Sequence, residues 1–92
     1  MLRLFFKTKI IDFKLVAPFS KNVSLAGTFN NWSTNSLKMN KDDKGVWRVK
    51  LKLKPGCYEY KFVIDGKWLT DPENMFTSVS NSGIVNSVVE VK

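Results

Sequence analysis

The sequence has 92 residues, 43% of them hydrophobic, and a formal net charge of +7. This length fits a single domain over residues 1–92, and no apolar run approaches the ~18 residues of a membrane span. Histidine is absent, which excludes the usual zinc sites and histidine-based catalysis.

The first half of the chain is typical of short strands separated by turns. Residues 1–9 hold an apolar run broken by Lys7 and Lys9, without a small-residue cleavage site, which indicates an edge strand or a ragged terminus rather than a signal peptide. Apolar and polar residues alternate over 11–15, and the run stops at Pro18, which cannot donate to a sheet. Residues 23–27 form the next predicted strand and enter a turn at 29–33.

The second half contains the clearest strand signals. A short strand is predicted at 37–39, followed by a polar connection over 40–45 and an alternating strand over 46–54. Pro55-Gly56 predicts a type II turn, and residues 58–64 form the strand after it. Asp65-Gly66 predicts a tight hairpin that returns residues 67–69 antiparallel. Residues 71–74 break this strand, 77–83 form a small-polar loop, and 84–91 form the last strand.

The pattern as a whole predicts an all-β fold. About seven short strands without any helical period indicate a two-sheet antiparallel β-sandwich. The basic residues at 48, 50, 52 and 54 alternate with apolar ones, which favours a solvated strand face over a nucleic-acid surface. We expect neither a nucleic-acid nor a membrane partner. Cys57 is the only cysteine, so an internal disulfide is excluded and a cytoplasmic location is expected.

The titratable residues offer little for catalysis. Asp71 and Glu73 are close in sequence, but two carboxylates must face each other across a cleft to hydrolyse a glycoside. An Asp-Pro turn on a domain this small does not wall off such a cleft. The five glycines lie at separate turns, so no phosphate-binding loop is present. The sequence therefore predicts no enzyme activity, no cofactor and no metal.

The aromatic residues divide into two classes. Four of them fall at alternating strand positions and are expected in the core, namely Trp47, Tyr58, Tyr60 and Phe62. Trp32 and Trp68 lie in or next to turns, where a large exposed ring needs a reason. Each is either a platform for a flat apolar ligand, such as a pyranose ring, or a side chain packed against its loop. By their positions alone, Lys61 and Asn86 are ordinary solvent-facing residues.

Several ordered motifs run from about Asp12 to Val91. They cover residues 13–18, 23–32, 56–68, 71–72 and 85–86. At these spacings the chain resembles the glycogen-binding domain of the β subunit of AMP-activated protein kinase. More broadly, it is similar to the family 48 carbohydrate-binding modules, which include N-terminal domains of glycogen branching enzymes. The resemblance implies an early-set immunoglobulin-like β-sandwich. It also implies sugar recognition by four residues: Trp32, Lys61, Trp68 and Asn86.

The loop before the last strand departs from the kinase-type pattern. Where those members carry a leucine that inserts beside the glucan and a threonine that bonds to it, this sequence has Ser82 and Ile84. The apolar prong is therefore missing or moved. Asn31, Ser82 and Ile84 are the candidate loop contacts.

The resemblance implies a non-catalytic module that binds α-1,4-glucan, such as glycogen or starch. Its expected ligands are α-glucan polysaccharides and malto-oligosaccharides. Its expected role is to tether a partner, either a glycogen- or starch-metabolising enzyme or a kinase-type complex. The altered loop leaves a second reading open, namely a protein-interaction or structural β-sandwich that has lost sugar binding.

Overall fold

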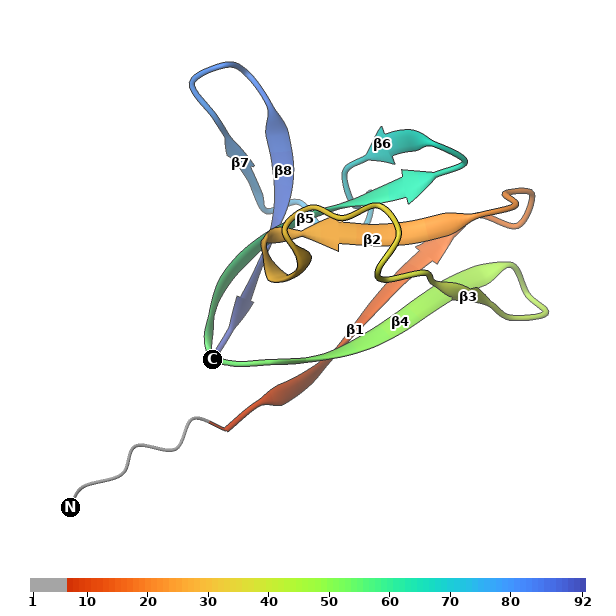
Figure 1. The fold of residues 1–92 in the computed structure, drawn as a ribbon, viewed down its shortest axis with the longest axis horizontal. Coiled ribbons are helices and arrows are strands. Elements are labelled where there is room, and N and C mark those ends of the chain that lie inside the picture. The colour runs from red at the N-terminus through yellow and green to blue at the C-terminus, as the bar shows by residue number, and fades with distance from the viewer. Residues whose placement is uncertain (1–6) are drawn as a thin grey trace.

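The computed structural model describes residues 7–92, so most of the predicted segment 1–9 lies outside the described residues (Figure 1). In this range the chain forms eight strands and one short 3-10 helix, η1. Their bounds are β1 Lys9–Val16, β2 Val23–Gly27, η1 Thr28–Asn30, β3 Asn40–Lys41, β4 Val46–Leu53, β5 Gly56–Ile64, β6 Lys67–Leu69, β7 Thr77–Val79 and β8 Val85–Val91. Because η1 has three residues, no helix in 7–92 is long and apolar enough to cross a membrane.

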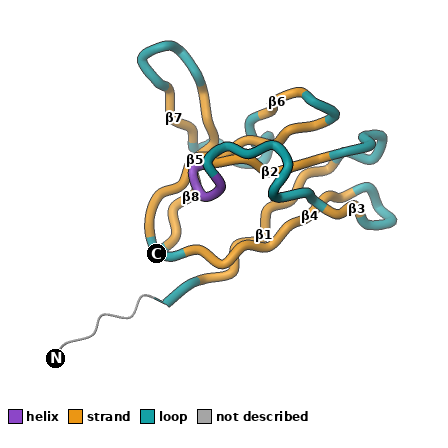
Figure 2. Tube along the Cα trace, in the orientation of Figure 1, coloured by secondary structure: helices purple, strands orange, loops and turns teal. Residues whose placement is uncertain are grey.

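The strands form two antiparallel sheets (Figures 1 and 2). One sheet has the order β1-β4-β3, and the other has the order β2-β5-β8-β7 with β6 also paired to β5. All strand pairs are antiparallel, which fits connections that are mostly short turns. The predicted two-sheet antiparallel β-sandwich is confirmed.

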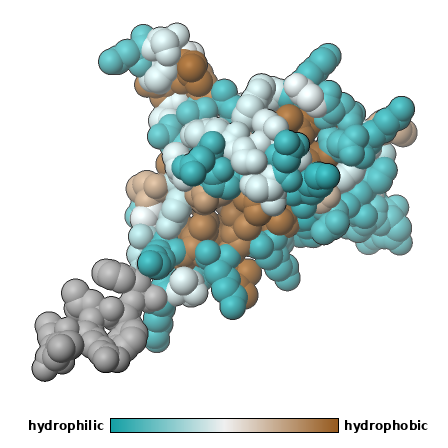
Figure 3. All heavy atoms as spheres, viewed as in Figure 1, coloured by the Kyte–Doolittle hydropathy of each residue, from teal (hydrophilic) through white to brown (hydrophobic). Residues whose placement is uncertain are grey.

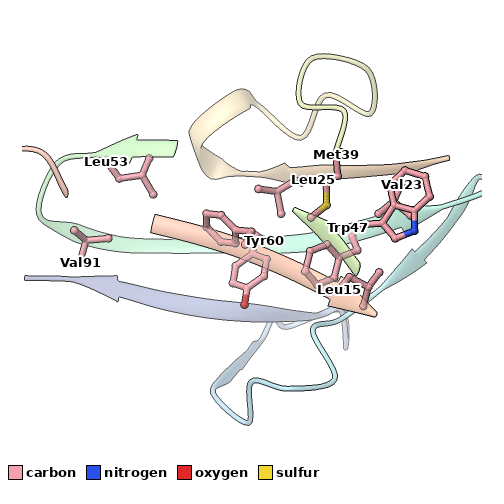
Figure 4. Close-up of a cluster of buried hydrophobic side chains, with 10 residues drawn as sticks. Leu15, Val23, Leu25, Met39, Trp47, Leu53, Tyr60 and Val91 are labelled. Atoms are coloured by element: carbon pink, nitrogen blue, oxygen red, sulfur yellow. The ribbon is translucent and has the colours of Figure 1, made fainter. Parts of the chain in front are cut away.

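The core lies between the two sheets, where alternate residues of facing strands meet (Figure 4). On the outer face that Figure 3 shows, most of the surface is hydrophilic and hydrophobic atoms emerge in a patch near its middle. Phe13 of β1 and Tyr60 of β5 contact edge to face, with ring centroids 5.0 Å apart. Phe62 is fully buried, and Trp47 is 7% exposed. Complete burial of one such side chain stabilises the fold by about 1.5–3 kcal/mol. The predicted core positions of the strand aromatics are therefore confirmed, with Tyr58 at the margin of the cluster.

A polar network closes the core beneath β5 and β8. The Tyr60 hydroxyl donates to Asp71 Oδ2 at 2.6 Å, and the backbone N–H of Asp71 donates to Ser87 Oγ at 2.8 Å. Ser87 is fully buried. Burial raises the pKa of Tyr60 above its ordinary value, and the bond to Asp71 raises it further. The Asp-Pro turn that the sequence places after β6 is thus anchored to the core.

The segment 37–41 corrects the prediction of a strand at 37–39. Leu37 O and Met39 N bond to β2, where Lys38 forms an isolated bridge with Ser24. The chain then crosses to the other sheet, and Asn40–Lys41 pairs with β4. The regular strand therefore lies in the predicted polar connection, because the extended segment divides its hydrogen bonds between two sheets.

Two further predictions are wrong in detail. Gly56 has a φ of 154° and begins β5, whereas the second central residue of a type II turn has φ near +80°. Residues Thr77–Val79 form β7 against β8, although small polar residues predicted a loop over 77–83. An edge strand tolerates such residues because only one of its sides is paired. Together β7 and β8 form a hairpin that projects from the sandwich (Figure 1).

Candidate carbohydrate-binding site

An open cavity of about 590 Å³ lies on the outer face of the sheet that contains β5. It is lined by Thr28, Trp32, Glu59, Lys61, Trp68, Ser80, Ile84 and Asn86. These residues come from η1 and its loop, from β5, from β6 and from the β7–β8 hairpin. The fold therefore brings together all four residues that the resemblance singles out.

Trp68 is placed in the cavity by the β5–β6 hairpin. Asp65 and Gly66 have φ values of 47° and 84°, as a type I′ turn requires, so the predicted tight hairpin is confirmed. The Asp65 carboxylate accepts hydrogen bonds from the backbone N–H groups of Lys21 and Asn22, which fixes the hairpin to the start of β2. Trp68 pairs with Val63 and is 48% exposed. Its ring is thus held on a rigid hairpin and still faces solvent.

Trp32 reaches the same cavity from a strained backbone. Its φ is 59°, in the left-handed region that bulky residues rarely adopt. Such a conformation costs about 1–3 kcal/mol and persists only where the surroundings enforce it. The half-buried Trp32 ring lies 6.3 Å from the Trp68 ring, centroid to centroid, at an interplanar angle of 56°. The two rings form an inclined pair at the cavity wall.

Asn30 enforces the conformation of the Trp32 loop. Its Oδ1 accepts from Gly27 N at 2.9 Å, and its Nδ2 donates to the backbone oxygens of Leu25 and Ser33 and to Ser36 Oγ. The backbone N–H of Trp32 also donates to Gly27 O at 2.9 Å. One asparagine side chain therefore forms hydrogen bonds at both ends of the loop. These bonds explain why Trp32 can keep a backbone conformation that is unfavourable by itself.

The polar side of the cavity contains a residue that the sequence reasoning missed, Glu59. Its Oε1 accepts hydrogen bonds from Asn86 Nδ2 at 3.2 Å and from Ser78 Oγ. These bonds, the one from Ser78 first, lower the pKa of Glu59 below its ordinary value of 4.5. Because Asn86 donates to Glu59, its Oδ1 is left to accept from a ligand. Lys61, next along the same face of β5, supplies a cationic donor.

The lowered pKa of Glu59 predicts a contribution to stability that depends on pH. A carboxylate whose pKa is lower in the folded state stabilises the protein above its unfolded pKa, near 4.5, and this contribution is lost as pH falls through the folded value. We expect the free energy of unfolding of the wild type to fall more steeply below pH 4.5 than that of Glu59→Gln. Urea unfolding between pH 6 and 3 measures both slopes. Equal slopes would contradict the prediction, since the glutamine side chain of the variant cannot titrate.

The three candidate loop contacts occupy different places. Ile84 lines the cavity and is 53% exposed, and its N–H donates to Ser80 Oγ at 3.1 Å. Ser82 bonds to Ser80 through its hydroxyl but does not line the cavity. Asn31 is exposed, ends η1 with a φ of 53° and also lies outside the lining. The apolar side chain that the hairpin contributes to the cavity is therefore Ile84.

The described residues 7–92 contain no group of three or more His, Cys, Asp or Glu side chains placed to hold a metal ion. The lining of the cavity instead combines two large apolar rings with one ammonium group, one carboxylate and one amide. Flat apolar faces surrounded by hydroxyl groups are the features of a sugar ring that such a surface recognises. A small β-sandwich with this site belongs to the class of carbohydrate-binding modules.

Comparison with known proteins identifies the family. Residues 17–92 match the family described as the glycogen recognition site of AMP-activated protein kinase. The chain is 41% identical over 70 residues to protein PTST homolog 2, chloroplastic, of Arabidopsis thaliana. It is 38% identical over 72 residues to the 5'-AMP-activated protein kinase subunit beta-1 of Sus scrofa. The chain therefore belongs to this glycogen-recognition family, which confirms the predicted resemblance to a glycogen-binding domain.

The relatives differ in how much of them the chain matches. The matched regions cover 76% and 78% of this chain but 13% and 56% of the two relatives. Among solved structures, the maltogenic amylase from S. marinus superposes with a TM-score of 0.79 at 28% identity, over 98% of this chain and 15% of the amylase chain. The common part is thus the module itself, and each of these proteins contains much sequence outside it.

Proposed function

We propose that the cavity between the β5–β6 and β7–β8 hairpins binds α-1,4-glucan. Trp32 and Trp68 would stack on glucose rings, while Lys61 and Asn86 would bond to their hydroxyl groups. The observation that carries this proposal is the convergence of these four side chains on one open cavity. Glu59 would support the site by orienting the Asn86 amide.

The position of Ile84 on the β7–β8 hairpin supports the interpretation that the apolar prong is moved rather than missing. It lies in the cavity with both indoles, whereas Ser82 does not. We infer that the Ile84 side chain packs against the glucan from the side opposite the two indole rings. Such a contact would compensate for the polar residue at position 82.

Modest affinity is expected from the size of the site. If each indole covers about 60–100 Å² of apolar surface, stacking contributes about 1.5–2.5 kcal/mol per ring. After the cost of association, the dissociation constant for a malto-oligosaccharide is expected between about millimolar and tens of micromolar. Such a module works best as a tether, because a polymer presents many sites and a linked partner gains effective concentration.

The partner follows from this tethering role. We propose that the module brings a glycogen- or starch-metabolising enzyme or a kinase-type complex to the polysaccharide, and that the module itself has no catalytic role. The chain's similarity to a kinase β subunit and to part of an amylase supports both partners.

The exposed free thiol of Cys57 supports a reducing, cytoplasmic location, which imaging of a tagged protein tests.

An NMR titration with maltoheptaose tests the proposed function. We expect the indole N–H signals of Trp32 and Trp68 to shift with one common dissociation constant, while the signal of buried Trp47 stays in place. Trp47 is an internal control because its N–H donates to Ala17 O at 2.8 Å within the core. If no indole signal moves at ligand concentrations about tenfold above the weakest dissociation constant expected for two stacked rings, the protein-interaction reading takes the place of this proposal.

A further inference from the structure

A second cavity lies farther along β5 and β8, and three of its lining residues, Cys57, Val88 and Glu90, are on the same sheet face as Glu59 of the indole cavity. It has a volume of about 480 Å³ and is lined by Cys57, Asn74, Phe76, Val88, Val89 and Glu90. Phe76 is 70% exposed, so this cavity presents a large aromatic ring to solvent without any partner in the described residues to cover it. Phe76, Val88 and Val89 together give this cavity an apolar wall, and an apolar wall with a few polar side chains beside it is the usual form of a ligand site.

The strand register makes the two cavities neighbours. Glu59, in the lining of the indole cavity, pairs with Val88, in the lining of the second one. The N–H of Val88 in turn donates to Phe76 O at 2.9 Å. Adjacent strands are about 4.8 Å apart, so the Cα atoms of Phe76 and Glu59 are separated by about 10 Å. A single extended ligand can therefore contact both cavities.

The backbone of Phe76 is fixed by Asn74. The Oδ1 of Asn74 accepts from Phe76 N at 3.0 Å, and its Nδ2 donates to Val88 O at 2.9 Å and to the Tyr60 hydroxyl at 3.1 Å. The exposed ring thus stands on a segment that is bonded both to β8 and to the core. Because the backbone of this segment is already ordered, binding of a ligand to the ring has only a small entropic cost for ordering the protein.

We propose that Phe76 forms a second stacking subsite, which binds glucose units of the same α-glucan chain beyond those held by the two tryptophans. The apolar face of a glucose ring would lie on Phe76 and Val88, and the Glu90 carboxylate at the rim would accept from its hydroxyl groups. Continuity with the indole cavity favours the glucan over a separate partner, since a chain that leaves Asn86 and Glu59 along the sheet face meets Phe76 next. This inference rests on the proposed function.

The dependence of affinity on glucan length tests the second subsite. Maltotriose is chosen to occupy one cavity and maltoheptaose to reach both, with calorimetry as the readout. If Phe76 loses about 40–60 Å² of apolar surface to the ligand, Phe76→Ala should weaken maltoheptaose binding about five- to tenfold. The same variant should bind maltotriose as the wild type does, and Phe76→Trp should bind maltoheptaose more tightly. Phe19→Ala is the matched control, because Phe19 is 97% exposed and lines neither cavity.

The outcomes separate this inference from the proposed function. If the wild type and Phe76→Ala bind maltoheptaose equally while both bind maltotriose, the second subsite is refuted and the indole site stands. If the wild type binds neither sugar, the proposed function fails and the second subsite fails with it. Since Phe76 is largely exposed, the variant should keep the wild-type fold, which the amide spectrum checks.

Discussion

Replacing Trp32 and Trp68 together with alanine is expected to abolish retention of the protein by glycogen. Each ring is expected to contribute about 1.5–2.5 kcal/mol by stacking, so the double variant loses about 3–5 kcal/mol. With wild-type dissociation constants between about millimolar and tens of micromolar, this loss removes measurable binding. Affinity electrophoresis in gels that contain glycogen measures the effect as lost retardation.

The two single variants sharpen this expectation. Trp68→Ala changes a half-exposed side chain on β6 and should weaken binding about tenfold or more without altering the fold. Trp32→Ala removes the ring but keeps a side chain at a φ of 59°, so the backbone strain is not relieved. The conservative control is Trp68→Tyr, which keeps an aromatic face and should be retarded more than Trp68→Ala. Unchanged retardation of the double variant would refute stacking by these rings.

Most of the strands, and the separation of Trp32 and Trp68 from the core aromatics, were predictable because their signals are local. Alternation over β4 marks one buried face, and Asp65-Gly66 specifies a turn geometry that returns Trp68 beside Val63. The position of Trp32 in a turn already separated it from the core aromatics. Local pattern left open whether these rings face a ligand or their own loops, and the convergence with Lys61 and Asn86 comes from the folded structure.

The parts that were not predictable depend on contacts between distant segments. The Glu59 carboxylate accepts hydrogen bonds from Ser78 and Asn86, which are 19 and 27 residues away in the sequence. The residues next to Glu59 in the sequence do not indicate these bonds. The same holds for Thr77–Val79, which forms a strand because β8 offers a free edge, and for Asn40–Lys41, which pairs with β4 after the chain leaves β2. Propensity decides little in such short segments, since tertiary pairing overrides it.

Substitution of Gly27 by alanine is expected to be the most damaging single change to fold and site together. Gly27 ends β2 beneath the Trp32 loop with extended backbone angles, so its conformation suits any residue. Space is what it lacks: an added Cβ would lie 2.4 Å from the backbone oxygen of Glu59 and 2.7 Å from Cζ of Phe29. Because the Glu59 oxygen belongs to the neighbouring strand, β2 or β5 must shift.

Relief of this clash should cost about 2–3 kcal/mol, as other overpacked cores do. For a domain of this size that lowers the melting temperature by about 10–20 °C. Gly66→Ala is the control, because its Cβ would meet no atom within 4 Å and the cost is limited to the strain at a φ of 84°. Thermal unfolding followed by circular dichroism compares the two.

Since Gly27 O also accepts from Trp32 N, and Glu59 lines the cavity, the Gly27 variant should lose glycogen retention even at temperatures where it stays folded. Full retention in a folded Gly27→Ala protein would show that the geometry of the Trp32 loop does not control the site.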